Sequence, residues 1–215
     1  MAEVQTNGMG QVERAADQAS LHVSYTHQAK DRTNATSALT ARIGTVESAL
    51  TREGVQIRDR RLAVHDVWDG KRRSGAQATQ SYQLRITDLA VLNDLIGDLM
   101  VTEPTTLRGP FWELANPGEA RRDAQRETVR DARQRAEVYT DELGCELGRL
   151  ISIADSGVQV QSLRGAAMGM SLASSAVARP DIAELSLEPQ LVTVTATCTM
   201  TWEITQSDSP SPANS

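Results

Sequence analysis

The chain has 215 residues, enough for one large domain or two small ones. Hydrophobic residues make up 40% of the chain and charged residues 23%. These proportions are close to globular averages, so we do not expect a disordered chain, a collagen-like repeat or a disulfide scaffold. The net charge of −6 argues against nucleic acid as the main partner, because that role needs a basic surface.

The first half of the chain has patterns typical of a β-α-β-β-α-β order. Apolar and polar residues alternate from Ala19, as in a half-buried strand. Apolar residues then recur at steps of three and four, as in an amphipathic helix that ends at Gly54. The predicted elements are a strand at 19–26, a helix at 30–52, strands at 56–68 and 76–87 joined by a polar hairpin tip at 69–75, a helix at 88–100 and a strand at 106–115.

The second half begins with a strong helix start, Asn116-Pro117-Gly118-Glu119, in which Asn116 caps the helix and Glu119 closes a capping box. We expect this helix to run to Leu143, with an inner stripe of Ala120, Ala124, Thr128, Ala132, Ala136, Tyr139 and Leu143. A strand at 146–154 follows, then a long loop at 155–189 and a last strand at 192–204. This last strand is longer than usual.

These elements predict an α+β fold. The first six match the ferredoxin-like βαββαβ layout, an antiparallel sheet with helices on one face. An α-β-β unit with a long C-terminal strand is appended to it. The predicted boundaries are a flexible N-terminus at 1–7, a domain at 8–206 that contains the flexible loop 155–189, and a disordered tail at 207–215.

Three segments resemble a known family, the bacterial SIMPL-domain proteins, which include periplasmic and outer-membrane immunogenic antigens and oxidative-stress-defence proteins. Gly8-Met9-Gly10-Gln11-Val12 resembles the family's opening GxGxV strand. Residues 131–153 are similar to its DARxKAExLA…LGxxLGxxxSI signature, and residues 192–204 to its long closing strand. The resemblance implies a non-enzymatic domain that self-assembles, in some members into rings, with a role in stress response or the cell envelope.

The chain shows neither the signal peptide nor the lipoprotein anchor that family members usually carry. No segment approaches the ~18 apolar residues of a membrane helix. We therefore expect a cytoplasmic protein without membrane insertion. Cys145 and Cys198 lie outside any CxxC or Cys/His cluster, which predicts two reduced thiols, with Cys198 buried and Cys145 more accessible.

The residues predict no enzyme, no cofactor and no metal site. His22, His27 and His65 lack the spacing of zinc ligands. A nucleophile would need a nearby His and an orienting carboxylate, and no GxSxG elbow is present. Gly8-Met9-Gly10 precedes a strand rather than a helix, so it lacks the helix N-terminus that a phosphate loop needs.

The strongest candidate interface is the threonine row of the last strand, whose members alternate with apolar residues: Thr193, Thr195, Thr197, Thr199 and Thr201. The row fits three interpretations, which are a solvent-facing side, an edge strand kept polar against aggregation, or a contact with another subunit. The partner we expect is a second copy of the chain, with an unidentified protein as a further possibility. The alternative function is a ligand-binding module that uses the 155–189 loop through Met168, Met170 and Leu172.

Two basic clusters could either bind an anion or simply form polar surface. The arginines at 121–133 alternate with Asp and Glu, which favours a salt-bridged helix face over a phosphate site. Lys71-Arg72-Arg73 at the predicted hairpin tip could contact an anionic partner or form a simple polar turn.

Overall fold

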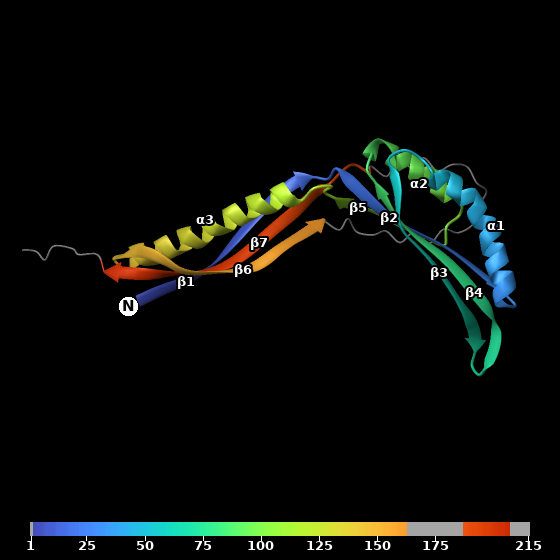
Figure 1. Cartoon of the computed structure of the whole chain (residues 1–215), viewed down its shortest axis with the longest axis horizontal. Helices are drawn as coiled ribbons and strands as arrows, with labels where there is room; N and C mark the ends of the chain where they lie inside the picture. Colours follow the sequence, from blue (N-terminus) through green and yellow to red (C-terminus); the bar gives the residue numbers. More distant parts are fainter. Residues whose placement is uncertain (1, 163–186, 207–215) are drawn as a thin grey trace, which may run out of the picture. The chain divides into compact units, whose positions relative to one another are not determined.

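The computed structural model describes residues 2–162 and 187–206 (Figure 1). It has a mixed α/β fold with three helices and two antiparallel sheets. The described elements are β1 Ala2–Ala15, β2 Gln18–Ala29, α1 Arg32–Leu50, β3 Val55–Asp69, β4 Arg72–Ile86, a 3-10 turn Leu89–Val91, α2 Leu92–Val101, β5 Thr106–Glu113, α3 Gly118–Glu142, β6 Cys145–Ser162 and β7 Leu191–Gln206. They form two compact units, so the single domain predicted at 8–206 is described below as two parts.

The four-stranded unit consists of β2 to β5 with α1 and α2. Its strand order is β3-β4-β2-β5, and every neighbouring pair is antiparallel. Helix α1 contacts β2, β3 and β4 and also touches α2, so both helices lie on one face of this sheet (Figure 1). The core between helices and sheet follows from the predicted periodicities, with Leu21, Val23 and Tyr25 buried from β2 and Ala35, Leu39, Val46 and Leu50 from α1.

The three-stranded unit consists of β1, β6 and β7 with α3. Its strand order is β1-β7-β6, and α3 runs along the sheet (Figure 1). The apolar row of β7, from Val192 to Trp202, is buried as predicted. Its far end packs with the helix in a cluster of Ala132, Ala136, Cys198, Met200 and Trp202.

Close contact between β1 and α3 depends on small residues on both elements. The buried side of α3 carries mainly alanine and threonine, at a strict four-residue step: Ala120, Ala124, Thr128, Ala132, Ala136 and Thr140. On β1, Gly8 and Gly10 face this stripe, and a Cβ atom at either position would lie 2.1 Å from a carbonyl oxygen of the helix. The hydroxyl of Thr6 donates a hydrogen bond to the Ala132 carbonyl oxygen at 2.7 Å. The family-like GxG sequence thus brings the strand against the helix backbone.

Four local predictions differ from the structure. Residues 1–7, predicted as a flexible N-terminus, form a strand from Ala2 onward. This segment is ordered because β7 pairs with it and α3 packs against it. Residues 155–162, predicted as loop, continue β6. The N-cap of α3 is Pro117, one residue later than predicted, and its side chain makes no capping hydrogen bond. Asn116 still accepts a hydrogen bond from the Gly118 N–H at 3.1 Å. The buried stripe ends at Thr140 and leaves two predicted members, Tyr139 and Leu143, exposed.

A carboxylate also links β1 to α3. Asp131 accepts a hydrogen bond from the Met9 backbone N–H at 2.9 Å and pairs with Arg135 at 3.0 Å. The Met9 hydrogen bond, then Arg135, lowers the pKa of Asp131 below its ordinary value of 3.8. A lowered pKa in the folded state means that this stabilisation is complete above the ordinary value and is lost as pH falls through the folded value.

We therefore expect the free energy of unfolding of the three-stranded unit to fall as acid protonates Asp131, and Asp131→Asn to weaken that dependence. Denaturant unfolding between about pH 6 and pH 2 measures it. Equal pH dependence in the wild type and the variant would contradict a role for Asp131.

Candidate functional site

The threonine row lies on the face of the three-stranded sheet away from α3. Because β7 is the central strand of its sheet, the interpretation of the row as a polar edge strand is wrong. Both edges of β7 are already paired, so the row can only pack face to face with a partner. Two of its members bond within the sheet, where the Thr199 hydroxyl donates to Asn7 at 2.8 Å and Gln5 donates to Thr201 at 3.4 Å.

Strand β6 forms one edge of the three-stranded sheet, and β1 forms the opposite edge. Within the described residues, β6 has β7 as its only neighbour, so one row of its backbone N–H and C=O groups lacks a strand partner. The strand has 18 residues and spans roughly 60 Å. Four of its large aliphatic side chains are 39% to 54% exposed, namely Leu150, Ile151, Ile153 and Val160. A long, apolar, unpaired edge of this kind is a template for pairing with another chain.

Two other edge strands, β3 and β1, are more polar than residues 150–162 of β6. Along β3, one of the two outer strands of the four-stranded sheet, residues 58–61 are all charged and separate the two exposed large aliphatic residues, Ile57 and Leu62. The exposed positions of β1 are mostly polar. From Leu150 to Ser162, β6 has a single charged residue, Asp155, and neither Lys nor Pro. Charges and prolines are the usual protection of a free edge, so we regard β6 as the candidate interaction site.

Sequence analysis missed the second half of this site. Asp155-Ser156-Gly157 resembles a turn, and Gly157 does take a positive φ of 98°, yet the strand continues beyond it. The available signal was the short apolar and polar alternation Val158-Gln159-Val160-Gln161.

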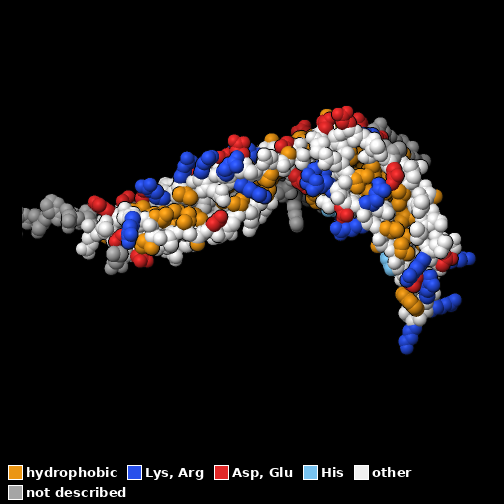
Figure 2. Space-filling view, in the orientation of Figure 1, with side chains coloured by type: hydrophobic (Ala, Val, Ile, Leu, Met, Phe, Trp, Pro, Cys, Tyr) orange, Lys and Arg blue, Asp and Glu red, His pale blue; other side chains and the backbone are white. Residues whose placement is uncertain are grey.

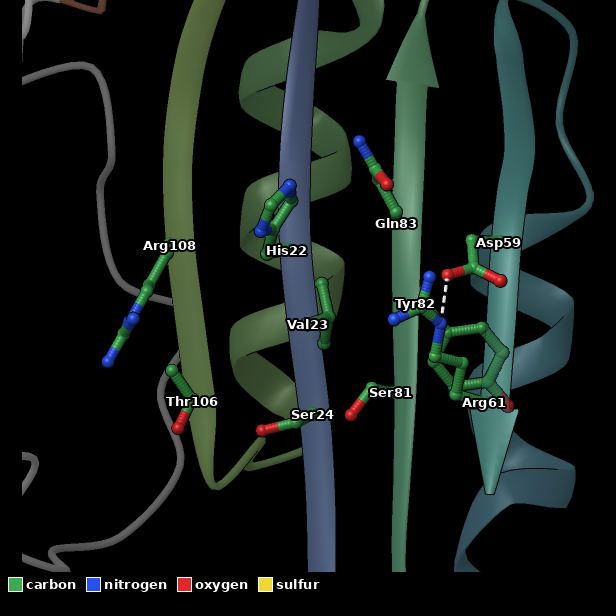
Figure 3. A pocket seen from close by; sticks show the side chains of 10 residues that line it. All are labelled: His22, Val23, Ser24, Asp59, Arg61, Ser81, Tyr82, Gln83, Thr106 and Arg108. Carbon is green, nitrogen blue, oxygen red and sulfur yellow. Dashed lines mark ion pairs between the residues drawn. The ribbon is translucent and has the colours of Figure 1, made fainter. Parts of the chain in front are cut away.

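A second feature is a hollow of about 430 Å³ on the open face of the four-stranded sheet (Figure 3). The strand register aligns its polar side chains in two rows across the sheet, which are Arg108, His22, Gln83 and Asp59, then Thr106, Ser24, Ser81 and Arg61. Asp59 is neutralised by Arg61 at 2.6 Å, and Arg108 points away from β2 (Figure 3). Polar side chains on the uncovered face are typical of an antiparallel sheet, so the hollow is a weaker candidate than β6.

The remaining predicted residues are placed as follows. Met168, Met170 and Leu172 lie outside the described residues, as does most of the 155–189 loop and the tail 207–215. Cys198 is buried and Cys145 is partly exposed, as predicted, and burial raises the pKa of the Cys198 thiol. Within the described part of the chain, no three His, Cys, Asp or Glu side chains are grouped closely enough to hold a metal ion.

The arginines of α3 form the salt-bridged face that their spacing predicts. Four pairs connect neighbouring turns of the helix at 2.6 to 3.0 Å, which are Arg126–Asp123, Arg130–Glu127, Arg133–Glu137 and Arg135–Asp131. Pairs of this kind stabilise a helix by a few tenths of a kcal/mol each, roughly 0.2–0.5. Most of this positive charge is therefore compensated within the helix.

Comparison with known families agrees with the resemblance found in the sequence. A family model described as SIMPL, a protein of unknown function (DUF541), matches residues 4–202. That range contains the GxG segment that contacts α3, the signature region that ends in β6, and most of β7. A comparison with curated proteins finds no match. Because the family match covers almost the whole chain, the protein belongs to the SIMPL family.

Proposed function

We propose that this protein is a non-enzymatic, self-assembling SIMPL-domain protein that forms a homo-oligomeric ring or scaffold. The setting that the family resemblance suggests is stress response or cell-envelope function. The single observation that carries the proposal is β6, an 18-residue strand whose outer edge has no partner strand among residues 2–162 and 187–206 and which carries four exposed aliphatic side chains.

Two surfaces would serve the assembly. Pairing of β6 with β6 of another copy around a two-fold axis satisfies the free backbone groups and buries the aliphatic side chains of both strands. Such a contact alone closes as a dimer. A ring or scaffold needs a second contact, and the threonine face of β7 is suited to one, because Thr193, Thr195 and Thr197 are only half-buried within one copy.

The fold that we propose for the four-stranded unit is ferredoxin-like. Its support is the position of β4, which lies between β2 and β3 although α1 connects those two strands directly. This is the split β-α-β arrangement. The unit would then act as a separately folded body attached to the assembling one.

Light scattering coupled to size exclusion tests the assembly. We expect a wild-type mass that is a multiple of 23.3 kDa. Ile151→Lys together with Ile153→Lys should weaken association at least about tenfold, because two charges would be buried or opposed in a paired edge. Leu62→Lys is the matched control, since Leu62 is 56% exposed on the charged edge strand β3, and it should leave the mass unchanged.

A wild-type monomer at micromolar concentration would contradict self-assembly. An oligomer that keeps its mass in the Ile151/Ile153 variant would instead exclude β6 as the interface. In that case Thr195→Arg would test the face of β7 in the same way.

A further inference from the structure

The β3–β4 hairpin extends beyond the rest of its sheet. Pairing between β2 and β4 ends at Ala29 and Ala76, whereas pairing between β3 and β4 continues to Asp69 and Arg72 (Figure 1). Residues 67–75, which we call the hairpin tip, therefore form a two-stranded ribbon around a two-residue turn. Gly70 has a φ of 59° in that turn, as a tight hairpin requires.

The hairpin tip exposes a tryptophan. Trp68 lies opposite Arg73 in the register and is 61% exposed. The other two tryptophans, Trp112 and Trp202, are only 4% and 5% exposed. Packing against the core therefore does not explain Trp68, whose large apolar ring is left mostly in contact with water.

The hairpin tip is also positively charged within an acidic chain. It contains Lys71, Arg72 and Arg73 against a single carboxylate, Asp69, which gives a net charge of +2 where the whole chain has −6. Arg73 pairs with Asp66 at 3.1 Å, and Arg32 binds the same carboxylate. Lys71 and Arg72 form no ion pair within the described residues. Figure 2 shows the Lys and Arg side chains gathered at this end of the hairpin.

We propose that the hairpin tip is a peripheral docking site for an anionic phospholipid surface. Tryptophan is favoured at the headgroup level of a bilayer, where its ring is apolar and its N–H finds a hydrogen-bond partner. Lysine and arginine are attracted by the negative surface potential of anionic lipids. A narrow convex ribbon end suits a fluid interface, because headgroups rearrange around it. Docking of this kind involves no spanning segment, and no helix in the described part of the chain is long and apolar enough to cross a bilayer.

Vesicle co-sedimentation and tryptophan fluorescence test this proposal on the full chain. We expect binding to phosphatidylglycerol vesicles and none to phosphatidylcholine vesicles at low salt. Binding should be lost as the screening length shortens from about 10 Å at ~0.1 M salt to about 3 Å at ~1 M. Because the other two tryptophans are buried, a blue shift and quenching by brominated lipid would report Trp68.

Three variants separate the contributions. Lys71→Gln with Arg72→Gln should weaken binding about 25-fold, or about fivefold for each cation. Trp68→Ala should also weaken it and remove the fluorescence change. Arg121→Gln with Arg122→Gln is the control, because it removes the same charge from the exposed surface of α3 and should change binding little.

Equal binding by the hairpin variants and the wild type would overturn the proposal, as would failure to bind phosphatidylglycerol. Binding of poly-glutamate without vesicle binding would overturn it in favour of an acidic protein partner. The oligomer mass, measured on the same samples, reports assembly separately, so failure of one proposal is distinguishable from failure of the other.

Discussion

Gly8→Ala is expected to destabilise the three-stranded unit by about 3 kcal/mol or more, the upper range for added volume in a packed interior. The new methyl carbon would lie 2.1 Å from the Thr128 carbonyl oxygen and 2.7 Å from the Ala132 Cβ. Because the nearest atom belongs to the helix backbone, no side-chain rotation relieves the clash, and α3 as a whole must move. Gly10→Ala meets the Ala124 carbonyl oxygen in the same way.

Hydrogen exchange measured by mass spectrometry locates this effect. Protection should fall in β1, α3 and β7 and persist in the four-stranded unit, which has its own core. The control is Gly44→Ala in α1, where nothing lies within 4 Å of the new Cβ. That change should stabilise the protein by about 0.5–1 kcal/mol, the usual gain for alanine over glycine inside a helix. An unchanged stability for Gly8→Ala would contradict the close packing described for β1 and α3.

Trp202→Ala is expected to cost about 3–5 kcal/mol, the range for removing a large aromatic side chain from a core. Trp202 belongs to the apolar cluster between β7 and α3, whose other members are small or flexible: Ala132, Ala136, Cys198 and Met200. With the indole gone, those residues cannot fill the space. Denaturant unfolding followed by far-ultraviolet circular dichroism gives the change in free energy.

The same substitution at Trp68 provides the comparison. Trp68 lies on an exposed ribbon, so Trp68→Ala should change the free energy of unfolding by no more than about 0.5 kcal/mol. A large loss of stability at this position would mean that the indole has a structural role. It would then weaken the case that Trp68 is exposed for contact with a membrane surface.

Local periodicity determined much of the fold. The alternation of Val192 to Ile204 and the three-and-four spacing in 30–52 each predicted an element, because burial of one face leaves its period in the sequence. The interleaved charges of α3 likewise predicted its ion pairs, since residues three or four apart are neighbours on a helix. The family could also be recognised from short segments alone, and the family comparison confirms it.

Periodicity did not predict strands whose buried positions are occupied by residues other than apolar ones. The buried positions of β1 include Thr6, Gly8 and Gly10. These residues are not hydrophobic, and their small size lets the strand lie close to α3. Residues 1–7 were therefore predicted as a flexible terminus, and residues 8–12 were identified as a strand only by their resemblance to the family. The second half of β6 was missed for another reason. Its alternation of Val158 and Val160 with Gln159 and Gln161 is only four residues long and follows the turn-like Asp155-Ser156-Gly157.

Only the tertiary structure decided which strands lie at the edges of the sheet. The threonine row of β7 and the apolar run of β6 are both visible in the sequence, but strand order is set by pairing between residues far apart in the chain. That pairing places β7 in the centre and β6 at the edge. The candidate interface is therefore β6 and not β7, although β7 has the clearer sequence pattern. A free edge depends on the order of strands in the sheet, which no single segment determines.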